Sequence, residues 1–195
     1  MKRGLALWLV IFFAIARVAM AAADFGVEVL ISVHDQKLAV VKNNQVMAEY
    51  KISTSRFGVG DELGSYKTPS GVLWVCNKIG DNLPLGAVIK HRAATGEVLA
   101  PNAPGRDPIV TRVIWLKGLS GDTQRAYDRC IYIHGTAEEK LVGKPVSWGC
   151  IRMKSKDVVQ LYDAVCVGTH VTISEKKLAA LLPSNPFADR LASWD

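Results

Sequence analysis

The sequence lacks the patterns that mark metal sites, repeats and nucleic-acid binding. Its 195 residues contain no CxxC and no HExxH, so metal ligation has little support and we expect neither a metal nor another cofactor. The chain has no internal repeat and no low-complexity segment. The formal net charge is +6, but the basic residues form no clustered stripe, so nucleic acid is not an expected partner. These absences leave a globular chain of about the length of one domain.

Long apolar runs are also scarce, and the one that exists lies at the N-terminus. A basic start, Met1-Lys2-Arg3, precedes the apolar residues 5–16, and Ala19-Met20-Ala21 offers a cleavage site, with 21–23 as a second choice. This order is typical of a secretory signal peptide, predicted over residues 1–23. An uncleaved anchor is the alternative, but a spanning helix needs about 20 apolar residues and Arg17 interrupts the run. We therefore expect an exported chain that meets a membrane only during export.

Cysteine is sparse, and the even number of cysteines is a poor guide to disulfide bonds in this chain. An exported chain with an even number of cysteines usually carries disulfides, and this one has Cys76, Cys130, Cys150 and Cys166. If Cys150 is catalytic, three remain and at most one bridge can form. Cys76 and Cys166 lie in apolar segments and are interpreted as small buried residues, so we expect the three to be reduced.

Short apolar runs between polar turns predict a mainly β domain. The expected strands are 27–33, 37–41, 46–53, 72–77, 109–116, 130–134 and 170–173. Residues 78–107 are too long for a plain connection, so they are either functional or contain short strands. Helical spacing over 158–165, with Ser155 as N-cap, predicts one late helix, and 178–182 predict a second that Pro183 ends. Residues 26–182 are then one domain and 183–195 a tail.

Two short motifs carry the chemistry. Ile133-His134-Gly135-Thr136 ends a predicted strand, and Ser147-Trp148-Gly149-Cys150 forms a loop before the predicted helix. A free thiol has a pKa of about 8.5 and is mostly un-ionised near neutrality, so it needs a nearby base to become a nucleophile. His134 is the candidate base. Gly149 lets backbone N–H groups approach an oxyanion.

These residues resemble the L,D-transpeptidase catalytic domain family, the YkuD-like fold. The resemblance covers His-Gly-Thr at 134–136, Ser-x-Gly-Cys-Ile-Arg-Met at 147–153, and Lys67-Thr68-Pro69-Ser70-Gly71. It extends over roughly residues 26–174 and implies a β-sandwich-like catalytic domain. Many members carry His where this chain has Trp148, a departure that bears on substrate preference more than on chemistry.

The resemblance also implies roles for single residues. The carbonyl of Gly135 would hold the His134 tautomer, and the N–H groups of Gly149 and Cys150 would stabilise the oxyanion. Three neighbours of the nucleophile are candidate substrate contacts, each with an alternative. Arg152 binds a substrate carboxylate, supports the loop, or lies at the surface; Ser147 binds substrate or caps the loop; Trp148 is a pocket wall or a packed aromatic.

The resemblance implies an enzyme that acts on peptidoglycan stem peptides, and together with the predicted signal peptide it fits the periplasm; we expect a monomer. Cys150 would form an acyl-enzyme on a tetrapeptide stem, release D-Ala and pass the acyl group to an amine. Two alternatives remain: an L,D-carboxypeptidase that uses water, and a catalytically silent wall-binding module. His34, His91 and His170 are expected to be structural or at the surface. Arg92, Arg106 and Arg112 surround a Pro-rich loop that contacts substrate or is merely solvated, and residues 105–108 are interpreted as a rigid turn that presents charge. Residues 137–146 form a lid or a static connection.

Overall fold

The computed structural model describes residues 26–119 and 121–183. The predicted signal peptide and all but the first residue of the predicted tail lie outside the described residues. Within the described ranges, no helix is both long and apolar enough to span a bilayer.

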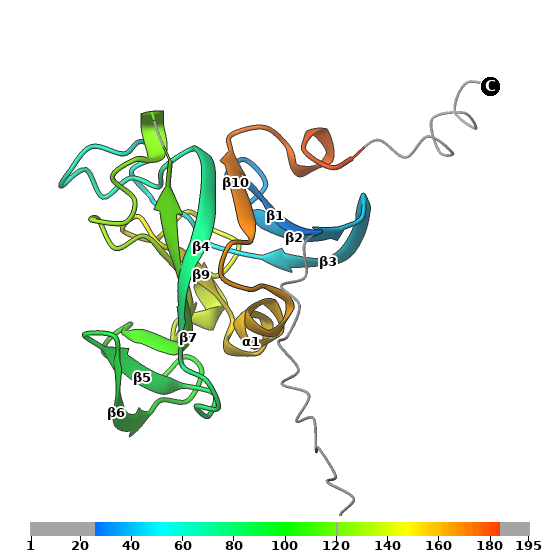
Figure 1. The fold of residues 1–195 in the computed structure, drawn as a ribbon. Helices are drawn as coiled ribbons and strands as arrows, with labels where there is room; N and C mark the ends of the chain where they lie inside the picture. The colour runs from blue at the N-terminus through cyan, green and yellow to red at the C-terminus, as the bar shows by residue number, and fades with distance from the viewer. Residues whose placement is uncertain (1–25, 120, 184–195) are drawn as a thin grey trace, which may run out of the picture.

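The described chain is built around one curled sheet of ten strands, with a single α-helix against it (Figure 1). The strands are β1 (Val27–Ser32), β2 (Lys37–Lys42), β3 (Gln45–Lys51), β4 (Gly71–Ile79), β5 (Ala87–Lys90), β6 (Ala93–Val98), β7 (Ile109–Gly118), β8 (Tyr132–Thr136), β9 (Ile151–Met153) and β10 (His170–Ser174). The helix is α1 (Ser155–Ala164), and three 3-10 turns are η1 (Gly121–Thr123), η2 (Glu139–Leu141) and η3 (Leu178–Ala180).

The sheet is mixed, with the strand order β3-β2-β1-β10-β4-β7-β5-β6, and β8 joins β7 to β9. Two of its pairs are parallel. β1 pairs with β10 from Glu28 opposite His170, which brings the two ends of the domain together. β8 pairs with β9, with His134 opposite Arg152. The second parallel pair matters for the site because it places the two chemical motifs on adjacent strands.

The core lies between the curled sheet and α1. Val158 and Leu161 of the helix are fully buried in the same apolar cluster as Ile114 of β7 and Ile133 of β8. Each such side chain contributes roughly 1.5–3 kcal/mol through burial. The prediction of a mainly β domain with one late helix is confirmed.

The helix starts differently from the sequence prediction. Ser155 is its first residue and Lys154 its N-cap, and no side chain of the cap residue bonds the helix. The Ser155 N–H instead donates to the carboxylate of Glu139 at 2.8 Å, so an acid from a distant segment satisfies the helix terminus. The expected second helix is only the short turn η3, whose first N–H donates to Asp35 at 2.7 Å.

The long connection 78–107 contains short strands, one of the two expected outcomes. β5 and β6 form a hairpin that extends the edge of the sheet beyond β7. Its turn consists of His91 and Arg92, with φ values of 51° and 65°. Every residue of β6 is exposed, so this hairpin is held by β5 and its pairing more than by burial.

Candidate active site

The loop that presents Cys150 is closed by Ser147. The Ser147 hydroxyl donates to the Cys150 carbonyl at 2.6 Å and accepts the Gly149 N–H at 3.2 Å. The Ser147 side chain is fully buried. It therefore caps the loop, which is one of the two roles considered for it, and the structure lends no support to the predicted substrate contact. The Gly149 N–H already donates to the Ser147 hydroxyl, so an oxyanion would have to share this donor with Ser147.

The same turn is supported from the N-terminal half of the chain. The hydroxyl of Thr68, itself buried, donates to the Gly149 carbonyl at 2.9 Å. Gly149 has φ +119°, and a Cβ there would lie 3.2 Å from the Lys67 carbonyl oxygen. Only glycine fits this conformation and this close approach. The Lys-Thr-Pro segment thus does more than turn the chain, since it braces the loop that carries Cys150.

His134 lies on β8 with only 5% of its surface exposed. Its Nδ1 is 2.7 Å from the Gly135 carbonyl oxygen, the contact that the family resemblance implied. A carbonyl can only accept, so Nδ1 carries the proton and Nε2 is left as the basic nitrogen. Gly135 has to be glycine here because a Cβ would lie 2.6 Å from the Val110 carbonyl oxygen.

The parallel pairing of β8 and β9 brings thiol and imidazole to one face of the sheet. His134 is opposite Arg152 and Ile133 opposite Ile151, and alternate residues of a strand share a face. Cys150, directly before β9, therefore shares the face of Arg152 and His134. The thiol hydrogen-bonds the Cys130 carbonyl at 3.4 Å.

Burial leaves both groups uncharged. It lowers the pKa of His134 to about 4, against a smaller opposing effect of the Gly135 carbonyl. It raises the pKa of Cys150 to about 11, and a backbone hydrogen bond from Tyr132 and the charge of Arg152 oppose this rise. Desolvation disfavours the charged form of each group. At neutral pH the resting pair is a thiol and a neutral imidazole.

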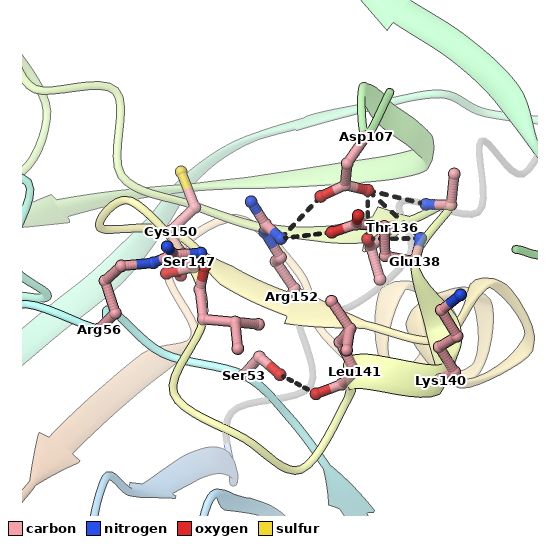
Figure 2. A network of polar contacts seen from close by, with 12 residues as sticks. Ser53, Arg56, Asp107, Thr136, Glu138, Lys140, Leu141, Ser147, Cys150 and Arg152 are labelled. Carbon is pink, nitrogen blue, oxygen red and sulfur yellow. Dashed lines mark hydrogen bonds and ion pairs between the residues drawn. The ribbon is translucent and has the colours of Figure 1, made fainter. Parts of the chain in front are cut away.

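Arg152 is committed to two acids, as Figure 2 shows. Its Nη1 lies 2.7 Å from Asp107 and 3.5 Å from Glu138. The Arg152 and Asp107 side chains are only 13% and 10% exposed. Of the roles considered, the supporting one fits, whereas the surface alternative is excluded. A substrate carboxylate at Arg152 would have to compete with Asp107.

Asp107 is the centre of this network, although the sequence suggested a turn that presents charge to solvent. It accepts the Thr136 hydroxyl and the Ala137 and Glu138 N–H groups, the last two at 3.1 and 3.3 Å. These three donors and the buried Arg152 guanidinium stabilise the negative charge of Asp107. Asp107 thereby links the end of β8 to β9.

Residues 137–146 are tied down rather than loose. The Gly143 N–H donates to the Ile52 carbonyl and the Lys140 N–H to the Asn102 side chain, both at 2.9 Å. The Leu141 carbonyl accepts the Ser53 hydroxyl at 3.2 Å (Figure 2). These bonds favour the static connection over the lid.

Trp148, two residues before Cys150, is 55% exposed and belongs to an aromatic cluster. Its ring centroid lies 5.3 Å from that of Phe57 and 5.2 Å from that of Tyr66, both edge-on. The guanidinium of Arg56 lies 5.6 Å from the Trp148 ring centroid. These contacts fit the packed aromatic, one of the two roles considered for Trp148, and the pocket wall stays a prediction.

Sequence reasoning missed two cavities that are both lined by Cys130, whose carbonyl accepts the Cys150 thiol. One of about 220 Å³ is lined by Ile89, His91, Arg92, Ile109, Val113, Cys130 and Tyr132. The other, of about 420 Å³, is lined by Arg92, Trp115, Tyr127, Asp128 and Cys130. In the sequence, the alternation of Cys130, Tyr132 and His134 along one strand places the three side chains on the same face. No sequence pattern predicted the hairpin that adds His91 and Arg92 to the cavity walls.

All four cysteines are free thiols, which agrees with the expectation that Cys76, Cys130 and Cys166 are reduced. They are half-buried rather than fully buried, and burial raises the pKa of Cys76. Within the described ranges, no three His, Cys, Asp or Glu side chains converge as metal ligands.

The sequence pattern of the L,D-transpeptidase catalytic domain, YkuD, matches residues 26–173. The chain therefore belongs to the YkuD L,D-transpeptidase catalytic domain family. Its similarity to known members can be measured in sequence and in structure.

Two proteins of Bacillus subtilis (strain 168) illustrate the sequence similarity. YqjB is 31% identical over 147 residues, which are 75% of this chain and 70% of that protein. YkuD is 39% identical over 82 residues, 42% of this chain and 50% of that protein. The crystal structure of L,D-transpeptidase 3 from Mycobacterium tuberculosis, in complex with a faropenem-derived adduct, gives a TM-score of 0.52 at 19% identity. This match covers 77% of the present chain but only 60% of that one, and it shows the shared fold.

Proposed function

We propose that the chain is a peptidoglycan L,D-transpeptidase that uses Cys150 as nucleophile and His134 as base. The supporting observation is the pairing of β8 with β9, which sets a buried imidazole, oriented by the Gly135 carbonyl, on the face of a braced thiol. Membership of the L,D-transpeptidase family supports a cell-wall peptide as the substrate of this pair.

The neutral resting pair decides how the first step runs. The Cys150 sulfur attacks the carbonyl that joins the diamino acid of a tetrapeptide stem to its terminal D-Ala. The thiol proton passes to Nε2 of His134 as the S–C bond forms, so no thiolate has to exist beforehand. Backbone N–H groups at Gly149 and Cys150 receive the negative oxygen.

The second half of the reaction uses the same proton. The C–N bond breaks, His134 returns the proton to the nitrogen of D-Ala, and a thioester to Cys150 remains. An amine of a second stem then attacks the thioester, and the product is a new amide link with a free thiol. If water attacks instead, the product is a trimmed stem and the enzyme is an L,D-carboxypeptidase.

Mass spectrometry of tetrapeptide muropeptides after incubation with the protein tests this function. We expect D-Ala release together with crosslinked product, and neither with Cys150→Ala. His134→Ala should lose at least about a hundredfold of the rate near neutrality. A folded protein that releases no D-Ala refutes the enzyme and leaves the silent wall-binding module, whereas trimmed stems without crosslinks establish the carboxypeptidase.

The place of action follows from the predicted signal peptide. We propose export to the periplasm, where the substrate lies, and action as a monomer on stem peptides without a cofactor. Detection of the protein without its first residues in a periplasmic fraction would support this, and an uncleaved protein in the cytoplasm would contradict it.

A further inference from the structure

The donor stem in the proposed reaction ends in a carboxylate, and Arg152 is poorly placed to receive it. Asp107 already takes the Arg152 guanidinium at 2.7 Å, with Glu138 as a second acid. The bound pair is nearly buried. Withdrawing a buried cation from its acid costs more than a substrate contact returns. A carboxylate subsite therefore calls for another cation near Cys150.

Arg92 is the candidate, because it lines two cavities with Cys130 and is held in an unusual backbone conformation. Residues 91 and 92 both have positive φ at the two-residue turn between β5 and β6. Such turns favour Asn-Gly, because positive φ strains residues with long side chains. Here the turn keeps His91 and Arg92 instead. Strain of this kind persists mainly where the side chains serve a function.

The surroundings of Arg92 fit a ligand with an acidic group. Its guanidinium lies 5.2 Å from the ring centroid of Trp115. That indole stacks on Tyr127 at 4.4 Å, and its buried N–H has no acceptor within the described ranges. Asp128 lines the same cavity, yet no ion pair joins it or any other described carboxylate to Arg92. The site thus offers positive charge beside aromatic side chains, without a described carboxylate that already neutralises it.

The cavity also lies directly beside the nucleophile. Both cavities that Arg92 lines are lined by Cys130, whose carbonyl accepts the Cys150 thiol at 3.4 Å. Tyr132, next along β8, lines the smaller one. A group bound by Arg92 is therefore only a short distance from the reacting sulfur.

We infer that Arg92 binds the C-terminal carboxylate of the donor peptide and so selects donors that end in a free acid. This rests on the proposed function and adds the specificity determinant to it. The guanidinium binds the carboxylate by a charge-assisted, forked contact, while the terminal residue occupies the smaller cavity, which Arg92 lines together with Cys130 and Tyr132. The peptide bond before that residue is then directed toward Cys150.

Calorimetric binding to the inactive Cys150→Ala protein tests this inference without turnover. The ligands are a tetrapeptide stem that ends in D-Ala and the same peptide with a C-terminal carboxamide. We expect the acid to bind at least about tenfold more tightly than the amide, the usual value of a charged hydrogen bond. In Cys150→Ala with Arg92→Gln, acid and amide should bind equally.

Lys90→Gln is the matched control, because it removes the same charge from the same hairpin at a residue that lines neither cavity. It should keep the preference for the acid. Arg92→Gly, which suits positive φ, should remove the preference without unfolding the hairpin, and this separates recognition from structural support. The inference is overturned if the acid does not bind, if acid and amide bind alike, or if the preference survives the loss of Arg92. D-Ala release by the active enzyme reports separately on the proposed function.

Discussion

The reactivity of Cys150 toward iodoacetamide follows from its burial. With a pKa of about 11, about one thiol in 10⁴ is ionised at pH 7, against about 3% for a free thiol. Ionisation alone predicts a rate roughly 300-fold below that of free cysteine. The more basic thiolate is about tenfold more nucleophilic, which leaves the alkylation roughly twentyfold to thirtyfold slower.

The shape of the pH profile is more decisive than the rate. His134, with a pKa of about 4, is neutral above roughly pH 5, and the resting thiol bonds the Cys130 carbonyl. Alkylation should therefore rise about tenfold per pH unit from pH 5 to 10 without a plateau. Intact mass over a pH series measures this, and Cys150→Ala supplies the background of the other three thiols.

A plateau near neutrality, or a rate above that of free cysteine, would refute the reasoning. Either result would mean that His134 already holds the thiol proton in the resting enzyme. The nucleophile would then be a preformed ion pair rather than one made when the substrate arrives.

Three further predictions concern stability and the loop. Burial lowers the pKa of His134 in the folded protein from 6.5 to about 4. The neutral ring therefore contributes to the free energy of unfolding above pH 6.5, and this contribution is lost as the pH falls toward 4. Urea unfolding should show the free energy of unfolding decrease by roughly 3 kcal/mol over this range, and His134→Gln should lack the decrease. Gly149→Ala should slow acylation roughly a hundredfold, since its Cβ would press on the Lys67 carbonyl; Gly105→Ala, with similar φ and open space, should not. Asp107→Asn should destabilise the fold by about 3 kcal/mol in thermal unfolding, because its buried arginine partner loses its main acid; Glu97→Gln, in an exposed pair, should leave Tm unchanged.

Each of these has an outcome that contradicts it. Equal acid sensitivity of the parent and His134→Gln would show that other groups cause the loss of stability. Equal effects of the two glycine substitutions would attribute the damage to φ alone. An Asp107→Asn protein as stable as the Glu97→Gln control would mean that the ion pair at β9 does not hold the site.

The candidate residues stand out in the sequence because their signals are local. An apolar strand that ends in His-Gly and a Gly-Cys loop single out His134 and Cys150 without a structure, and the parallel pairing of β8 with β9 then places the two motifs on adjacent strands. The strand β9 itself was missed, since three residues show no period that distinguishes a strand from a loop.

The supporting residues were not predictable, for two different reasons. The contact of Asp107 with Arg152 joins residues far apart in the chain, and no local pattern marks such a pair. The β5–β6 hairpin lacks both usual signals: its outer strand is exposed throughout, and His91-Arg92 stands where Asn-Gly would announce a turn. Ser155 looked like an N-cap because local preference takes no account of a distant acid such as Glu139.

The brace between Thr68 and Gly149 has a consequence for the order of folding. It joins distant parts of the chain, and β1 pairs with β10 at opposite ends of the domain. Contacts of such long sequence separation form late, because loop closure must precede them. Until then the thiol is solvated and ionises more readily than in the native protein. Completing the fold therefore shields Cys150 from oxidants and stray electrophiles, and the chain is most vulnerable to covalent damage while it is still unfinished.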